Sequence, residues 1–143
     1  MIDWVVTCLA LNVYFEARGE PVEGQVAVAL VTLNRAKLSG CEVCDVVFAD
    51  RQMSWVREFG YAHRIPKSIT RTKAWEKSKE VALASMYMQD FTSGATHFHT
   101  FEARPLWRFD VNMHVVGEWG NHVFYRQDGW SASCRSGKFK EVP

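Results

Sequence analysis

The segment 3–17 constrains the fold more than any other part of the sequence, because as a helix it would be apolar on every side. Its apolar residues fall all around the helix axis rather than along one stripe: Trp4, Val5, Val6, Leu9, Leu11, Val13, Tyr14 and Phe15. A helix of that kind is stable only when the rest of the chain surrounds it. We therefore expect a buried central helix, with Asp3 as its N-cap and a left-handed Gly19 near its end.

Two further helices are expected to cover this central one. The first spans about 21–38, because Pro21 suits the first turn of a helix and Ser39-Gly40 closes a run of apolar residues at helical spacing. The second spans about 70–90 and takes Thr70 or Thr72 as its N-cap.

The remaining segments predict a small sheet beside the helices. Residues 95–101 and 121–126 alternate as half-buried strands do. Three less regular segments are expected: short helix or turn over 43–60, a loop over 63–68 and an irregular tail from about 131. The sequence thus predicts an α+β fold, mainly α, and the length of 143 residues suits a single domain over residues 1–143.

Composition and charge exclude several functions. The 17 Lys and Arg residues nearly balance the 16 Asp and Glu residues, so sequence-independent binding to nucleic acid has no global electrostatic support. No run of 18 apolar residues predicts a membrane span, and the start lacks the basic segment of a signal peptide. We therefore expect synthesis in the cytosol and no stable membrane anchoring.

The charge is nevertheless uneven along the chain. Residues 1–50 carry a net charge of −4, whereas residues 51–80 carry +5. Two interpretations of the basic segment stay open, a solvated helix face and a patch that attracts an anionic polymer.

Four cysteines leave the redox chemistry open. Cys41 and Cys44 form a Cys-x-x-Cys pair, a weak signal for zinc or redox activity because no second pair follows. Cys8 lies in the apolar run and resembles a small core residue. The expectation is that all four, Cys134 included, are reduced and structural.

Glu16 is the most informative candidate for chemistry. It is a carboxylate at the end of an almost wholly apolar helix, where desolvation raises the pKa of a carboxyl group. An acid that stays protonated near neutral pH can protonate the leaving oxygen of a glycosidic bond. The alternative is a surface Glu16 paired with Arg18 or Arg35. Nearby Glu20 is interpreted as a cap of the second helix rather than as a second catalytic group.

Several ungapped blocks in the same order resemble the SleB-type cell wall hydrolase family, which includes spore-cortex-lytic enzymes. The blocks are Cys8 to Pro21, Glu23 to Ala29, Val31 to Arg35, Cys44 to Phe48, Gln52 to Trp55, Ala95 to His99, Pro105 to Trp107 and Gly120 to Arg126. One departure is Met53, where the family usually has Phe. The resemblance implies a lysozyme-like fold similar to lytic transglycosylase cores, with a small antiparallel sheet. It also implies cleavage of peptidoglycan between N-acetylmuramic acid and N-acetylglucosamine, with the family's single catalytic Glu falling on Glu16.

The candidate substrate-binding residues come from three parts of the chain. Gln52 and Ser54 offer hydrogen bonds to sugars, and Trp55 offers a stacking face, as Trp107 also does. His97 and His99 lie two apart on one strand and so face the same side. Tyr125 lies on the other strand. Core packing is the alternative for the aromatic residues, and no carboxylate at a telling spacing completes a metal site with the histidines, so neither a metal nor a cofactor is expected.

The function expected from these observations is a peptidoglycan-cleaving glycosidase, a lytic transglycosylase or muramidase, acting as a monomer. The expected source is a bacteriophage endolysin that stays in the host cytoplasm until a holin releases it to the periplasm or cell wall. A bacterial enzyme is the other source considered. The alternative functions are a non-catalytic peptidoglycan-binding module and a metal-dependent cell-wall amidase.

Overall fold

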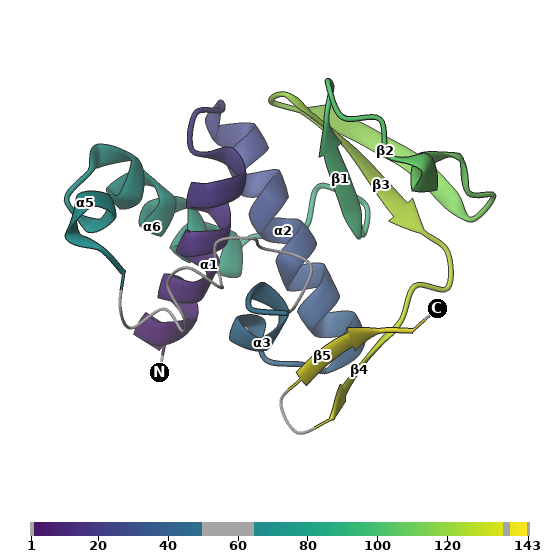
Figure 1. Cartoon of the computed structure of the whole chain (residues 1–143), viewed down its shortest axis with the longest axis horizontal. Helices are drawn as coiled ribbons and strands as arrows, with labels where there is room; N and C mark the ends of the chain where they lie inside the picture. The colour runs from purple at the N-terminus through teal and green to yellow at the C-terminus, as the bar shows by residue number, and fades with distance from the viewer. Residues whose placement is uncertain (1, 50–64, 136–137, 143) are drawn as a thin grey trace.

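The computed structural model describes residues 2–49, 65–135 and 138–142. Figure 1 shows the helices gathered on one side of the molecule and a three-stranded sheet on the other. The helices are α1 (Ile2–Ala17), α2 (Val22–Ser39), α3 (Val43–Val47), α5 (Lys67–Thr70) and α6 (Lys73–Met86). The strands are β1 (His97–Thr100), β2 (Met113–Trp119), β3 (His122–Gln127), β4 (Ala132–Arg135) and β5 (Lys138–Glu141).

Helix α1 is the buried centre of the helical half, as its all-round apolar pattern predicts. Every residue from Cys8 to Tyr14 is buried, so no side of that stretch faces solvent. α2, α3 and α6 all pack against it. Two details of the prediction are wrong: the helix begins at Ile2, which places Asp3 inside the first turn, and Gly19 does not take a left-handed backbone.

The two covering helices have the ends that local chemistry predicts. The Thr72 hydroxyl accepts a hydrogen bond from the Trp75 N–H and so caps α6. Gly40 ends α2 with a φ of 75°, a conformation that is cheap only for glycine. Part of the expected 63–68 loop is helical instead, because α5 begins at Lys67. None of the described helices is long and apolar enough to cross a bilayer.

The three-stranded sheet has the order β1-β3-β2 and is antiparallel throughout. Its outer strands flank β3, so His97 lies opposite Tyr125 on the neighbouring strand. A register shift between Val115 and Gly117 interrupts the β2–β3 ladder. Phe124 from β3 is fully buried and joins the sheet to the helices through a cluster that includes Val28 and Val31 of α2.

A second polar link fixes the sheet to the helices. The Glu20 carboxylate, between α1 and α2, lies with Oε2 2.6 Å from Nδ1 of His122. Its Oε1 accepts a hydrogen bond from the Asn121 N–H. The side chains of Glu20 and His122 are only 10% and 2% exposed. The interpretation of Glu20 as a helix cap is therefore wrong; its carboxylate holds the start of β3.

The described part of the C-terminal segment contains two strands, which corrects the expectation of an irregular tail. β4 and β5 form an antiparallel hairpin, with Ser133 opposite Lys140, and this hairpin packs beside α2 and α3 (Figure 1).

The cysteines form two disulfides, so the expectation of four reduced thiols is also wrong. Cys8 of α1 is bonded to Cys44 of α3, and Cys41 is bonded to Cys134 of β4. Each member of the Cys-x-x-Cys pair thus bonds to a distant cysteine rather than to its neighbour. The sequence pattern did not indicate these pairings, because the bonded cysteines are 36 and 93 residues apart.

Candidate active site

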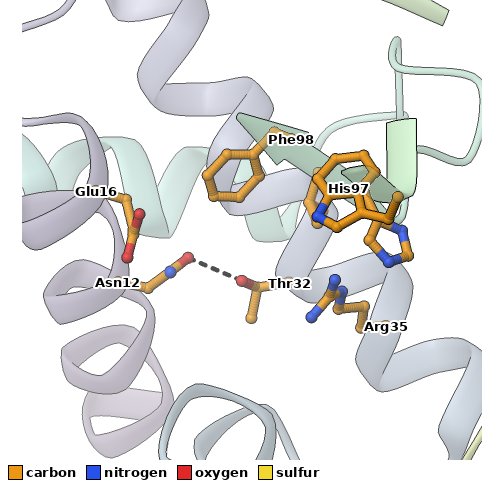
Figure 2. A pocket seen from close by; sticks show the side chains of 8 residues that line it. Asn12, Glu16, Thr32, Arg35, His97 and Phe98 are labelled. Carbon is orange, nitrogen blue, oxygen red and sulfur yellow. Dashed lines mark hydrogen bonds between the residues drawn. The ribbon is translucent and has the colours of Figure 1, made fainter. Parts of the chain in front are cut away.

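A pocket of about 230 Å³ opens between the helices and the sheet. α1 and α2 provide one side of the pocket, and β1 with the turn Leu106–Phe109 provides the other (Figure 2). Its lining residues among those described are Asn12, Glu16, Val31, Thr32, Arg35, His97, Phe98 and Trp107.

Glu16 lies in the last turn of α1 and is the one carboxylate among the described lining residues. Burial raises the pKa of this carboxyl group above its ordinary value, as the sequence predicts. The structure shows neither of the two pairings that the alternative interpretation requires. Arg18 lies over the Tyr14 ring at 4.7 Å, and the guanidinium of Arg35 lies 3.5 Å from Glu141. Glu16 has no hydrogen bond or ion pair with the described residues, so its proton is available to a ligand.

A hydrogen bond between the two helices forms the floor of the pocket beside Glu16. The Thr32 hydroxyl donates to Oδ1 of Asn12 over 2.8 Å, and both side chains are buried. Asn12 precedes Glu16 by four residues and so lies on the same face of α1. This bond sets the spacing of α1 and α2 where the carboxyl group of Glu16 projects (Figure 2).

Arg35 lies across the pocket from Glu16, next to Thr32 and His97 (Figure 2). Its Nε–H donates to the Thr96 carbonyl over 2.7 Å, and its Nη1 is the atom nearest Glu141. Burial lowers the pKa of Arg35 and Glu141 raises it, but a guanidinium stays charged at any physiological pH. The far side of the pocket therefore carries a fixed positive charge.

His97 is a neutral ring at the same side of the pocket. Burial and the nearby Arg35 charge lower its pKa to about 4. Its Nδ1 lies 2.8 Å from the Thr96 hydroxyl, whose oxygen already accepts from the Gln127 N–H. Thr96 is buried, and Nδ1 of His97 is the acceptor that the described residues offer its hydroxyl proton, so we assign Thr96 as the donor to Nδ1. This assignment places the single ring proton of His97 on Nε2, as a donor.

The other predicted residues of the sheet gather around Trp107. The rings of His97, His99 and Tyr125 all lie between 5.1 and 5.6 Å from that of Trp107, centroid to centroid. His99 Nδ1 is 2.7 Å from the Thr100 carbonyl, so this nitrogen carries the proton. The Tyr125 hydroxyl must therefore donate to Nε2 of His99, 2.8 Å away. Trp107 and His97 connect this aromatic cluster to the pocket, whereas Tyr125 is buried.

The structure describes only part of the predicted site. Gln52, Ser54 and Trp55 lie outside the described residues. Among the described residues, no third His, Cys, Asp or Glu joins His97 and His99 in a group that could hold a metal ion.

Five of the lining residues were not predicted, three of them polar (Asn12, Thr32 and Arg35) and two apolar (Val31 and Phe98). The signal for Asn12 was a lone amide in an apolar helix, one turn before Glu16. Arg35 lies in a block that resembles the family, but the sequence does not indicate that its side chain points into a pocket.

The described part of the basic segment, residues 65–80, includes a solvated helix face, as the first of the two interpretations predicts. Lys77 and Lys79 lie within 4 Å of Glu80 and Glu76 on the exposed face of α6. Exposed pairs of this kind contribute little to stability.

Comparisons with known proteins show the family to which the chain belongs. A family model described as Cell Wall Hydrolase matches residues 19–125. The spore cortex-lytic enzyme of Bacillus subtilis (strain 168) is 37% identical over 83 residues, which are 52% of this chain and 27% of that protein. This chain therefore spans about a quarter of the length of that curated relative.

Two solved structures share the fold. The catalytic domain of the Bacillus cereus SleB protein has a TM-score of 0.68 and 28% identity, with 87% of this chain and 91% of that chain covered. The catalytic domain of the germination-specific lytic transglycosylase SleB from Bacillus anthracis has a TM-score of 0.68 and 27% identity, with 86% and 94% covered. The expected architecture, mainly helical with a small antiparallel sheet and similar to lytic transglycosylase cores, is confirmed.

Proposed function

The chain belongs to the cell wall hydrolase family, and on that premise we propose that it cleaves peptidoglycan glycan strands between N-acetylmuramic acid and N-acetylglucosamine, with Glu16 as acid and base. The observation that carries this proposal is the partly desolvated carboxyl group of Glu16 in the pocket, which has no hydrogen bond or ion pair with the described residues. The family model begins at residue 19, so the role of Glu16 rests on the geometry and not on that match.

The chemistry requires Glu16 to act twice. As a neutral acid it protonates the glycosidic oxygen while the C1–O bond breaks and an oxocarbenium-like centre forms. The resulting Glu16 carboxylate then removes the proton from the C6 hydroxyl of the muramic acid, whose oxygen bonds to C1. The product is a 1,6-anhydro sugar, and the acid is regenerated. If water takes the place of the C6 hydroxyl, the product is the ordinary reducing sugar.

The surroundings of Glu16 favour a single-carboxylate mechanism. Glycosidases with two carboxylates need the second one at a defined distance across the bond. Of the described residues that line the pocket, Glu16 is the sole carboxylate, and nearby Glu20 is held by His122 and Asn121. The substrate's own acetamido group or protein dipoles are then left to stabilise the positive centre.

We propose that His99 and Trp107 contact the sugar rings beside the pocket, and that the buried Tyr125 orients His99 through their hydrogen bond. At about 230 Å³ the pocket is smaller than the roughly 300–1,000 Å³ that buries a drug-sized ligand. It therefore suits one sugar residue, and the neighbouring sugars need an open surface. Gln52, Ser54 and Trp55 remain predicted contributors to this surface.

The test is digestion of purified sacculi by the wild type and by Glu16→Gln. We expect the variant to lose activity at least about 100-fold, because the amide cannot donate and then accept the proton. Glu23→Gln is the matched control, since Glu23 is an exposed carboxylate in the first turn of α2. Full activity of Glu16→Gln would refute the mechanism. Mass spectrometry of the fragments distinguishes an anhydro product, lighter by one water, from a hydrolysis product.

The same assay separates the alternative functions. A non-catalytic peptidoglycan-binding module would bind sacculi and release no fragments. A metal-dependent amidase would release peptides and lose activity with a chelator, whereas we expect glycan fragments and no effect of the chelator.

We propose that the protein acts outside the inner membrane, where peptidoglycan lies. Two disulfides support this, because such bonds persist in oxidising compartments. The narrower role of a bacteriophage endolysin stays a prediction, tested by expression in a bacterium with and without a holin. Lysis that requires the holin is the expected result, and lysis without it would contradict holin-dependent release.

A further inference from the structure

The two ends of the pocket have opposite chemistry. Glu16 is the acid at one end, and at the other end Arg35 and His97 lie side by side (Figure 2). Arg35 has only donors, and the Nδ1 of His97 already accepts the Thr96 proton. This end of the pocket therefore offers N–H groups and a positive charge, and none of the described residues that line it there is a carboxylate.

The protein uses only part of the hydrogen-bonding capacity of Arg35. The Nε–H is taken by the Thr96 carbonyl, and Nη1 lies 3.5 Å from Glu141. No hydrogen bond joins Nη2 to the described residues. The Arg35 side chain is 13% exposed, whereas the Glu141 side chain is 45% exposed and so is well solvated. Glu141 approaches the guanidinium through Nη1, and the Trp130 ring centroid lies 5.6 Å from its central carbon, so Nη2 is left for a further acceptor.

The Nε2–H of His97 is a second donor without a hydrogen-bond partner among the described residues. Thr96 holds the ring from its other nitrogen, and Trp107 packs against it at 5.1 Å. The ring orientation is therefore fixed before a ligand arrives. Fixed donors beside a charged guanidinium suit a carboxylate better than a hydroxyl group, because hydrogen bonds to an ionised acceptor are stronger.

We propose that Arg35 and His97 form a carboxylate subsite that selects strands carrying the acid group of muramic acid over strands of N-acetylglucosamine alone. This rests on the proposed cleavage of glycan strands and specifies which feature of the strand is recognised. Muramic acid differs from glucosamine by a lactyl ether with a carboxyl group. That carboxylate is free in strands stripped of peptide, and in intact strands the stem peptides carry the carboxylates.

The test compares KM on strands that differ only in charge. The first substrate is strands stripped of peptide, with their lactyl carboxylates either free or converted to methylamides. The second is strands with stem peptides, whose peptide carboxylates are likewise either free or converted to methylamides. We expect wild-type KM to rise about tenfold on the methylamides of whichever strand supplies the carboxylate. The strand type that shows the rise identifies lactyl or stem carboxylates as the source.

Variants then attribute the effect to Arg35. Arg35→Gln should raise KM about tenfold on charged strands and less than about twofold on methylamide strands. Glu141→Gln should lower KM on charged strands, since it removes the competing carboxylate. Lys37→Gln is the control, because it removes an exposed positive charge two residues along α2 and should change neither KM.

Three results would overturn the inference. Equal wild-type KM on charged and methylamide strands of both types would show that the enzyme recognises no carboxylate. This measurement uses the wild type alone and so does not depend on the folding of a variant. An equal rise for Arg35→Gln on both kinds of strand would show a structural role through Thr96. Equal cleavage of chitin oligosaccharides and muramic acid strands would show no selection. Failure of the wild type to cleave any strand would instead refute the proposed function itself.

Discussion

The partly buried carboxyl group of Glu16 reduces the stability of the fold at neutral pH. Its pKa is raised by burial, so the folded protein binds its proton more tightly than the unfolded chain does. The contribution of Glu16 to the free energy of unfolding is fully present below the unfolded pKa of about 4.3, and it is lost as the pH rises through the folded pKa. At neutral pH the carboxyl group therefore makes the folded state less stable than a neutral side chain would.

Replacing this carboxyl group should stabilise the protein while it inactivates it. We expect Glu16→Gln to raise the free energy of unfolding by about 0.5–2 kcal/mol at pH 8, and to change it little at pH 4. Urea unfolding of both proteins at the two pH values measures this. Equal stability at pH 8 would mean that the carboxyl group is not desolvated in solution.

His97 gives a second pH dependence, of opposite sign. Its folded pKa of about 4 lies below the ordinary 6.5, so the unfolded chain binds the proton first. Stability is full above about pH 6.5 and falls as the pH drops toward 4. We expect His97→Gln to remove part of this acid destabilisation, on the order of 1–2 kcal/mol because the ring is only partly buried.

The measurement for His97 is NMR of the ring protons between pH 3 and 8. A midpoint near 4 is expected for the His97 ring. A midpoint near 6.5 for His97 would remove the argument that its Nε2 is a fixed donor of a neutral ring.

At the scale of elements, the link between sheet and helices depends on one tight turn. Gly120 joins β2 to β3 with a φ of 60°, and a Cβ there would collide with Oε1 of Glu20. Gly129 has a similar φ of 68° but open space around it. An alanine at either position would be strained by the left-handed backbone. Only at Gly120 would its Cβ also meet the Glu20 carboxylate.

Substituting each glycine by alanine therefore separates the cost of backbone strain from the cost of the collision with Glu20. We expect Gly129→Ala to destabilise the protein by about 1 kcal/mol and Gly120→Ala by about 2 kcal/mol or more. Denaturant unfolding of both variants measures the difference. Equal losses would mean that Glu20 moves away freely and does not hold the sheet.

The helices were predicted well because their signals are local. The all-round apolar pattern of 3–17, Thr72 and Gly40 each act within one or two turns of the chain. β2 was missed because Met113–Trp119 includes the interruption at Gly117 and has mostly solvent-facing or half-buried residues. The β4–β5 hairpin was missed because its packing comes from distant α2 and α3. In the site, Glu16 was predicted by its desolvated position, whereas Arg35 depends on contacts with Thr96 and Glu141 that no local pattern encodes.

At the scale of the whole molecule, two disulfides connect the early part of the chain to the rest. Cys8–Cys44 spans 36 residues and Cys41–Cys134 spans 93. The chain-entropy estimate gives each a stabilisation of about 4–5 kcal/mol, more for the longer loop. Both also fix the segment around α3, which packs on α1 and α2.

Reduction should therefore lower stability strongly. We expect the double variant Cys41→Ser with Cys134→Ser to lose about 2–5 kcal/mol, measured by urea unfolding, and a reducing agent to destabilise the wild type. Thiol titration of the unfolded, unreduced wild type should find no free thiol. Four titratable thiols in protein purified from an oxidising compartment would contradict the pairing.

The two bonds overlap along the chain, which has a consequence for cleavage of the backbone. A single cut between Cys8 and Cys44 leaves one partner of the first bond on each fragment, and a cut between Cys44 and Cys134 does the same for the second. One proteolytic nick anywhere from residue 9 to residue 133 therefore leaves both fragments covalently joined. Nicked protein would migrate as an intact chain on a non-reducing gel and separate only after reduction.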